Sequence, residues 1–369
     1  MFSFLRRKPP TPPLPAAPTF NERVTAFWKW FEEVAPRFYT TIEDGKCADL
    51  TDETSATVDK FLPGFSWVYG PGANGSGHSF TLTGEGDIHR QLLALHWLSQ
   101  APVIEGWTFH AARQPGEIKG HVIEMHDLRF DPKEIWVTPT IDEEEENIDL
   151  TIWHPAWERL EDRQKYSITF IFLDEALGEY GTGWWIGEIN FGKDRLSESF
   201  PLEELAAYAT DTSKKHEWKK FPPGECWTIY KVDGEEEDFP RADIFSLTAA
   251  VPKLFTEYMD TNGELEDPLR GTGSDYVYVS ISKDFFPKGE EVDKRGEIED
   301  ALTASLEKTA AGRIVGRAFG SERGYIDLLI YDGKRSLEKI RQTLRDQQVP
   351  AGTMIEFFAR EKRTQRIAL

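Results

Sequence analysis

The chain has little of what marks secreted, membrane-spanning or zinc-binding proteins. Its 369 residues include only two cysteines, Cys47 and Cys226, which form no CxxC pair. Neither a disulfide framework nor a cysteine-based zinc site is indicated, and a reducing compartment fits. No stretch approaches the roughly 18 apolar residues of a membrane span. The first residues contain no apolar segment long enough for a signal peptide, so a cytoplasmic location is expected.

The common catalytic and cofactor motifs are also missing. There is no GxSxG elbow, and Cys47 has no histidine partner that the sequence can place. His121 and His126 are five residues apart, whereas the HExxH zinc motif needs a spacing of four. The Gly-rich segment 70–77 lacks the lysine and the spacing of a P-loop, which favours a hairpin turn over a phosphate cradle. We therefore predict no catalytic, cofactor-binding or metal-binding residues and no cofactor.

Two further groups of residues invite a functional interpretation. His89 and His96 lie two turns apart on a predicted helix, but no third metal ligand suggests itself, which favours surface or capping roles. The C-terminal tail contains four basic residues without interleaved aromatics, so a solvated terminus is favoured over a nucleic-acid contact. These basic residues are Arg360, Lys362, Arg363 and Arg366.

What the chain has in excess is negative charge. Its formal net charge is −21, and the charge is unevenly placed. Residues 271–369 hold 17 basic and 16 acidic residues, whereas residues 1–270 carry a net charge of −22. Such a body repels nucleic acid and anionic membranes, and it attracts a basic protein. An acidic surface also serves solubility alone, and this simpler interpretation stands beside the first.

Changes in composition divide the chain into four segments. A leader over residues 1–18 is rich in proline and is predicted to be extended and disordered. Residues 19–195 are predicted to form an acidic α+β domain, in which Thr19 or Asn21 caps the first helix. Residues 196–274 are less regular and are treated as a connecting region. Residues 275–369 are predicted to form a separate C-terminal domain.

The acidic domain shows one pattern twice. Residues 65–112 follow the order strand, strand, helix, strand, with Asp87 as the cap of the helix. Residues 134–190 follow the same ββαβ order if the very apolar segment 160–177 forms the helix. This recurrence suggests an internal duplication whose halves share a sheet or pack sheet to sheet.

The C-terminal domain has the clearest signals. Alternating residues predict a strand at 276–282, and three further strands and two helices follow in the order βαββαβ. Ser336 is suited to cap the second helix. This order is that of the ferredoxin-like, split βαβ arrangement. In the connecting region, residues 244–258 predict a helix that is interrupted near Pro252.

Two segments resemble parts of bacterial proteins that are known only as domains of unknown function. These segments are residues 101–113 and 172–180, and the resemblance extends over roughly residues 20–195. Some proteins of that general kind occur among immunity and toxin-associated proteins. The resemblance implies no catalytic residues.

The sequence therefore favours a bacterial, non-enzymatic protein-interaction protein, of which an immunity or neutralising protein is one form, with a basic protein as its partner. No contact with nucleic acid or membrane is expected. Two alternatives remain open. One is a hydrolase or another enzyme whose site is built from scattered residues, which predicts a deep pocket with converging side chains and shifted pKa values. The other is a regulatory module that binds a small ligand at the C-terminal sheet.

Overall fold

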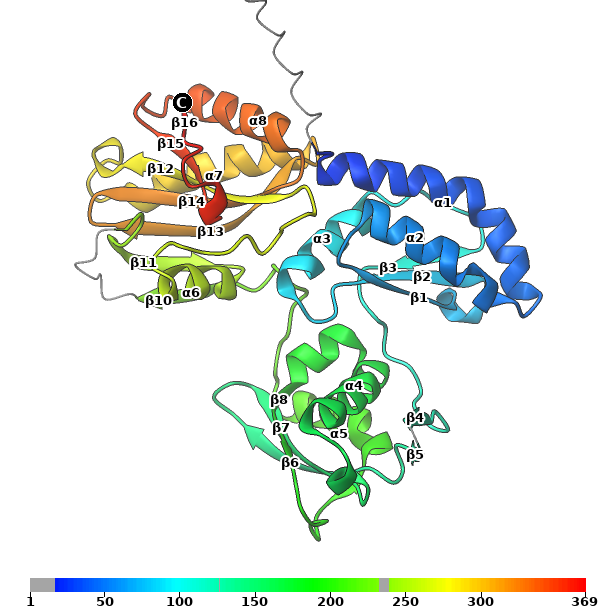
Figure 1. The fold of residues 1–369 in the computed structure, drawn as a ribbon. Helices are drawn as coiled ribbons and strands as arrows, with labels where there is room; N and C mark the ends of the chain where they lie inside the picture. Colours follow the sequence, from blue (N-terminus) through cyan, green and yellow to red (C-terminus); the bar gives the residue numbers. More distant parts are fainter. Residues whose placement is uncertain (1–16, 126, 232–238) are drawn as a thin grey trace, which may run out of the picture.

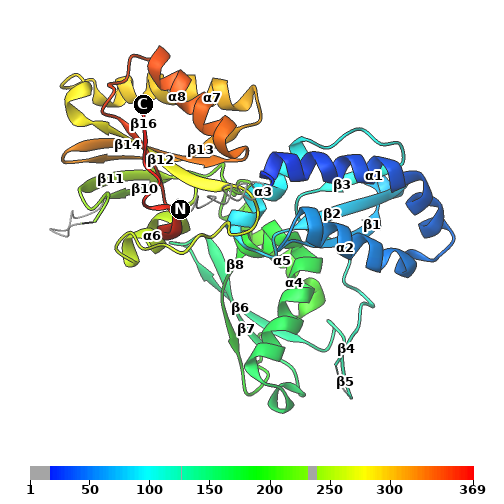
Figure 2. The ribbon, with the colours of Figure 1, turned by 45° about the horizontal axis from the view of Figure 1, so that its top comes forward.

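The structure is a computed structural model, and it has the α+β fold that the sequence predicts (Figures 1 and 2). It describes residues 17–125, 127–231 and 239–369, so nearly all of the predicted leader lies outside the described residues. Three regions meet near one short helix, α3 (Ile88–Ser99), as both views show. We refer to them as the N-terminal region (residues 17–112), the middle region (113–225) and the C-terminal region (226–369).

The N-terminal region packs helices against a three-stranded sheet in the order β1-β2-β3. The first two strands form an antiparallel hairpin, and β3 lies parallel to β2. The Gly-rich segment is thus the turn of a hairpin, as predicted. Besides α3, the elements are α1 (Phe20–Glu43), α2 (Thr51–Phe61), β1 (Ser66–Pro71), β2 (His78–Thr83) and β3 (Trp107–His110).

Helix α1 begins where the sequence places its cap. The Thr19 hydroxyl accepts a hydrogen bond from the Glu22 amide at 3.3 Å, and the Glu22 carboxylate accepts one from the Thr19 amide at 2.9 Å. This reciprocal capping box satisfies two amides that have no partner inside the helix. The apolar stripe of α1 is buried, and its aromatic rings contact those of β2, β3 and α3.

The middle region has a sheet of its own in the order β8-β7-β6-β9. Strands β6 and β7 are antiparallel, β8 lies parallel to β7, and the strands of the two predicted ββαβ segments therefore belong to separate sheets. The elements are β4 (Ile123–Met125), β5 (Leu128–Phe130), β6 (Trp136–Asp142), β7 (Asn147–Trp153), α4 (Asp162–Trp185), β8 (Ile186–Phe191), β9 (Phe200–Pro201) and α5 (Leu205–Lys215).

The C-terminal region is built on a seven-stranded sheet in the order β10-β11-β13-β14-β12-β15-β16, with neighbouring strands antiparallel. Helices α7 and α8 cover one of its faces (Figure 1). The elements are β10 (Thr228–Lys231), β11 (Ile244–Ala249), α6 (Pro252–Asp260), β12 (Asp275–Ser282), α7 (Glu291–Glu307), β13 (Gly312–Gly320), β14 (Arg323–Ile330), α8 (Gly333–Asp346), β15 (Met354–Phe357) and β16 (Ile367–Ala368).

Single 3₁₀ turns join several of these elements. They are η1 (Cys47–Leu50), η2 (Ala73–Gly75), η3 (Trp157–Arg159), η4 (Leu202–Glu204), η5 (Lys283–Phe285) and η6 (Arg360–Lys362). The last of them, η6, lies in the basic tail, which packs against the C-terminal sheet.

Two predictions in the C-terminal region are wrong. The single helix predicted over residues 244–258 is a strand, β11, followed by α6, because Pro252 starts a helix at its first turn and cannot continue one. The pairing of β11 with β13 decides the conformation of its short apolar run. Ser336 is not the cap of α8, which begins at Gly333. Its buried hydroxyl instead donates to the Ala311 carbonyl at 2.6 Å.

The order of the regions along the chain does not predict which of them share an apolar core. One core joins the N-terminal region to the C-terminal region, from Phe27 on α1 to Tyr276 and Leu329 on the C-terminal sheet. A second core lies wholly in the middle region, and a third lies between the C-terminal sheet and helices α7 and α8. The middle region therefore has an apolar core of its own.

Candidate functional site

The most prominent hollow lies along α4, where the helix is broken. Gly178 has φ +74° and ψ 160°, which interrupts the helical backbone. A side chain at this position would place its Cβ 2.9 Å from Pro115 Cδ and 3.0 Å from the Arg113 carbonyl oxygen. Both the backbone conformation and the close approach therefore require glycine. The segment that contains Arg113 and Pro115 is hydrogen-bonded to the broken helix, because the Glu179 amide donates to the Arg113 carbonyl at 3.0 Å.

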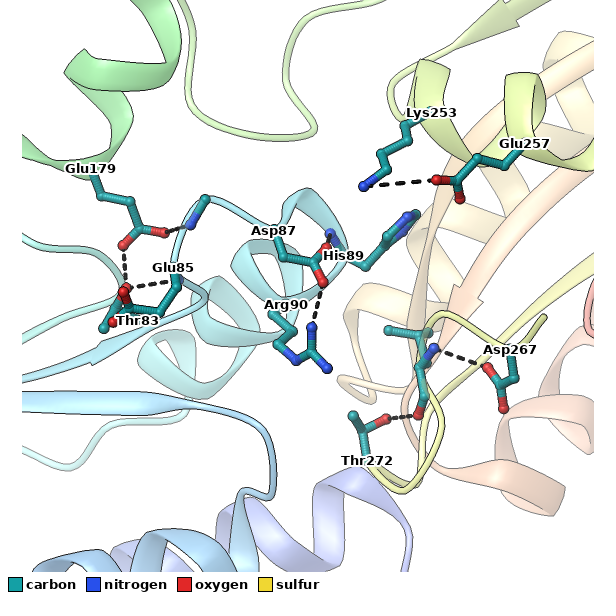
Figure 3. A network of polar contacts seen from close by, with 12 residues as sticks. Thr83, Glu85, Asp87, His89, Arg90, Glu179, Lys253, Glu257, Asp267 and Thr272 are labelled. Atoms are coloured by element: carbon teal, nitrogen blue, oxygen red, sulfur yellow. Dashed lines mark hydrogen bonds and ion pairs between the residues drawn. The ribbon is translucent and has the colours of Figure 1, made fainter. Parts of the chain in front are cut away.

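The break positions Glu179, whose buried carboxylate connects the middle region to the N-terminal region (Figure 3). It accepts hydrogen bonds from the Thr83 hydroxyl at 2.5 Å, the Gly86 amide at 3.0 Å and the Gln91 side-chain amide at 2.8 Å. The Arg113 amide adds a longer contact of 3.4 Å. All of these donors are neutral, so the carboxylate is held by hydrogen bonds rather than by an ion pair.

Between α4 and the loop that leads into α3 lies a cavity of about 1180 Å³, which we call the α4 cleft. Its walls combine aromatic and apolar side chains with carboxylates. Three large apolar residues on α4 are well exposed here: Tyr166 (40%), Phe170 (44%) and Ile171 (55%). The remaining lining residues are Glu85, Gly86, Ile88, Gln91, Arg113, Arg163, Ser167, Asp174, Glu175, Glu179, Tyr180, Thr182, Gly183, Trp184, Ile186, Gly187, Ile189 and Pro223.

Charge in the cleft is predominantly negative, and the surroundings shift the pKa of several lining groups, among them Asp174 and Arg113. Burial raises the pKa of the Asp174 carboxyl, with the nearby Glu179 adding to this effect, although a hydrogen bond from Thr182 opposes it. Burial alone would lower the pKa of Arg113, but its hydrogen bond to Glu85 and the surrounding carboxylates raise it. Arg113 donates to the Glu85 carboxylate at 2.9 Å. Arg113 therefore stays charged and neutralises part of the acidic wall.

The two histidines of α3 are buried. His89 is 2% exposed and its Nδ1 lies 3.0 Å from the Tyr276 hydroxyl, while His96 stacks on Tyr331 with ring centroids 3.7 Å apart. Burial is the main cause that lowers the pKa of each to about 4. The prediction of surface or capping roles is wrong. Both side chains join α3 to the C-terminal sheet as neutral groups.

The other predicted sites are not brought together. His126 lies outside the described residues, and His121 lies beside Glu175 at 3.5 Å on the rim of the cleft. Cys47 and Cys226 are both free. Among residues 17–125, 127–231 and 239–369, no three histidine, cysteine, aspartate or glutamate side chains are grouped to hold a metal ion.

The basic tail is not a loose, solvated terminus. Arg360 pairs with Glu266 at 2.6 Å, Arg366 pairs with Glu356 at 3.0 Å, and Lys362 and Arg363 pair with Asp275 and Glu264. These pairs hold the tail against the C-terminal sheet. The sequence could not reveal them, because the partners lie 10 to 99 residues away along the chain.

Comparison of the chain with models of protein families, with curated proteins and with solved structures finds no significant match. The resemblance of residues 20–195 to bacterial domains of unknown function therefore stays a prediction. In the part of the chain that the structure describes, none of the helices has the length and apolar character needed to cross a membrane.

The sequence reasoning missed Glu179 and Asp174, the residues that organise the cleft. One signal was present in the sequence. Gly178 interrupts an otherwise apolar helical segment and is followed at once by an acidic residue. A glycine inside a helical pattern often marks a packing or functional constraint.

Proposed function

We propose that the protein is a non-enzymatic binding protein and that the α4 cleft receives a basic segment of a partner protein. The observation that carries the proposal is the exposed ridge of Tyr166, Phe170 and Ile171 on one helix, set inside a hollow with carboxylates around it. Large apolar side chains exposed side by side and surrounded by polar groups are typical of interaction sites. The ridge supplies contact area, and the carboxylates select positive charge.

Charge beyond the cleft supports the same partner. The middle region, residues 113–225, contains 25 acidic and 13 basic residues, a net charge of −12. In the cleft, four carboxylates face two arginines, Arg113 and Arg163. Such a field speeds the approach of a basic partner and weakens as salt rises. An immunity or neutralising protein acting on a basic toxin is one form that this function can take.

Three of the four carboxylates in the cleft are poorly placed for catalysis. Glu179 is occupied by buried donors, and Glu85 is paired with Arg113. Glu175 faces His121 at 3.5 Å and is half exposed. Each of these three is already held by a contact within the chain, so none is free to act as a general acid or base.

The proposal can be tested with two labelled peptides of equal length, one rich in lysine and leucine and the other rich in glutamate and leucine. Fluorescence anisotropy should show binding of the basic peptide only, with an affinity that falls as salt is raised. Phe170→Ala should weaken binding about tenfold, because one large side chain in an interface contributes roughly 1–2 kcal/mol.

Phe245→Ala is the matched control, since Phe245 is 47% exposed on β11, in the C-terminal region, and Phe170 is 44% exposed. It should bind like the unaltered protein. Equal binding of both peptides, or the same loss in both variants, would contradict the proposal.

One observation favours a hydrolase as a second candidate. Asp174 lines the α4 cleft and has a raised pKa, which is the property of a general acid. The same experiment separates the two functions. Mass spectrometry after incubation should find the basic peptide intact, whereas cleavage that disappears in Asp174→Asn would favour the enzyme.

We also propose the finer fold assignments that the sequence suggested. The order β12, α7, β13, β14, α8, β15 and the antiparallel arrangement β13-β14-β12-β15 support a ferredoxin-like relationship for residues 275–369. The hairpin, helix and parallel third strand that recur as β1-β2-α3-β3 and β6-β7-α4-β8 support a duplication. The two free cysteines are consistent with the cytoplasm.

A further inference from the structure

A second hollow, of about 370 Å³, lies on the face of the C-terminal sheet that α7 and α8 leave open. We call it the arginine pocket. Its base is formed by Tyr278 and Ser280 of β12, and β14 and β15 form its sides. The other lining residues are Phe239, Pro240, Arg241, Arg323, Tyr325, Met354, Glu356, Arg363 and Arg366.

Four arginines converge on this pocket, in a chain whose net charge is −21. They come from separate segments: Arg241 precedes β11, Arg323 begins β14, and Arg363 and Arg366 follow η6. Glu356 is the carboxylate among the lining residues. Sequence separation this large means that the fold, rather than a local basic run, creates the concentration of positive charge.

The four arginines differ in the contacts that they already make within the protein. Arg241 is fully buried, is paired with Asp327 at 2.8 Å and lies within 5.0 Å of the ring centroids of Tyr278, Tyr325 and Phe358, so it serves as a fixed base. Arg366 pairs with Glu356, and Arg363 pairs with Glu264. Both are at the surface, where such pairs contribute less than about 1 kcal/mol and yield to a stronger acceptor.

Arg323 is the group most available to a ligand. Its Nη1 donates to the buried Ser280 hydroxyl at 3.2 Å, which fixes the guanidinium beside the pocket. Among the residues that the structure describes, Arg323 forms no ion pair with a carboxylate. A guanidinium has five N–H donors, and one bond to a hydroxyl leaves most of them free.

We propose that the arginine pocket binds a small phosphorylated molecule. Guanidinium groups approaching from several sides match the oxygens of a phosphate, which accepts paired N–H donors and carries up to two negative charges. The rings of Phe239 and Tyr278 and the side chain of Met354 offer an apolar surface to the rest of the molecule. The volume suits a ligand of small-metabolite size.

This site is separate from the α4 cleft and opposite to it in charge. It makes the alternative of a regulatory module with a small ligand at the C-terminal sheet more specific. It does not depend on the proposed function of the cleft. The proposed site also explains why the basic tail is held against the sheet, because its ion pairs bring Arg363 and Arg366 to the rim of the pocket.

Isothermal titration calorimetry of the full chain tests the proposal at constant ionic strength. The probes are inorganic phosphate, adenosine monophosphate and citrate. Adenosine monophosphate should bind with one site per chain, and phosphate more weakly at the same site. Citrate, whose charges all lie on carboxylates and which has no phosphate, should bind at least tenfold more weakly than adenosine monophosphate. Citrate binding as tightly as the phosphates, or no binding by any probe, would overturn it.

Two variants locate the site. Arg323→Gln should weaken the binding of adenosine monophosphate at least tenfold, and Arg366→Gln, which alters an exposed side chain, should weaken it about threefold. Arg335→Gln is the control, because Arg335 is an exposed arginine of α8 that lies outside the pocket. Unchanged affinity in both pocket variants would reject the site.

Discussion

The α4 cleft forms where two separately packed regions meet, whereas the arginine pocket lies on a single sheet. The walls of the cleft are joined by a few polar contacts centred on Glu179. The pocket rests on Arg241 and Asp327, a buried pair inside the core that the N-terminal and C-terminal regions share. Because its walls belong to regions with separate cores, we expect the first hollow to change shape more readily than the second. A cleft of the first kind suits a partner of variable shape, and a pocket of the second kind suits a small rigid ligand.

The largest effect is expected at the buried ion pair of Arg241 and Asp327, which supports the pocket. Asp327→Ala should lower the free energy of unfolding by about 3–5 kcal/mol, because it leaves the Arg241 charge buried without its partner. Urea denaturation followed by circular dichroism measures the loss. Asp346→Ala, at the exposed end of α8, is the control and should change stability by less than about 0.5 kcal/mol. A loss below about 1 kcal/mol in Asp327→Ala would show that the pocket does not depend on this pair.

A smaller and more local effect is expected at the cleft. Glu179→Ala removes the acceptor of the Thr83, Gly86 and Gln91 donors, and should cost about 2–3 kcal/mol. Because the middle region has its own core, the loss should appear as faster hydrogen exchange at the Gly86 amide and not at the amides of β14.

Glu188→Ala is the matched control for this change, since Glu188 is an exposed glutamate of β8 in the same region. Its exchange rates should equal those of the unaltered protein. Equal acceleration in β14 and at Gly86 in the Glu179 variant would mean that the two hollows are not independently supported.

The smallest effect per residue concerns the contact of α3 with the C-terminal sheet. The pKa of His89 and of His96 is about 4 in the folded chain and near 6.5 when unfolded, so the unfolded chain binds more protons between these values. Their stabilising effect is complete above pH 6.5 and declines as pH falls towards 4. At pH 5 the loss should be roughly 1–2 kcal/mol per histidine.

Urea denaturation at pH 7 and pH 5 measures this dependence. Charged groups near His89 are Asp87, Arg90 and Lys253, and only the first favours protonation. His96→Gln should reduce the difference between the two pH values, whereas His121→Gln, at an exposed histidine, should leave it unchanged. A pH difference that His96→Gln does not alter would contradict the assignment of His96 as a buried neutral group.

The predictions from sequence succeeded where local signals and tertiary packing agree. Asp87 caps α3, Thr19 caps α1, and the alternation at residues 276–282 is a strand, because capping and periodicity act within a few residues. They failed at residues 244–249, where pairing with β13 selects a strand, and at Ser336, whose hydroxyl bonds across to Ala311.

The candidate sites were almost wholly out of reach of the sequence. Glu179 accepts hydrogen bonds from residues 66 to 96 positions away, and Arg241 pairs with a residue 86 positions away. Nothing in the spacing of such residues marks them, since 64 acidic side chains offer too many choices. The histidines of α3 show the same difficulty, because the helical face is predictable but the surface that covers it is not.

By itself the sequence determined the mixed α+β class, most of the elements and the acidic character of the first 270 residues, all of which depend on local propensity and composition. Only the tertiary structure decided that the N-terminal and C-terminal regions share a core and that two hollows of opposite charge form. The physical reason is that burial and ion pairing depend on which distant surfaces meet, and a linear pattern does not specify that meeting.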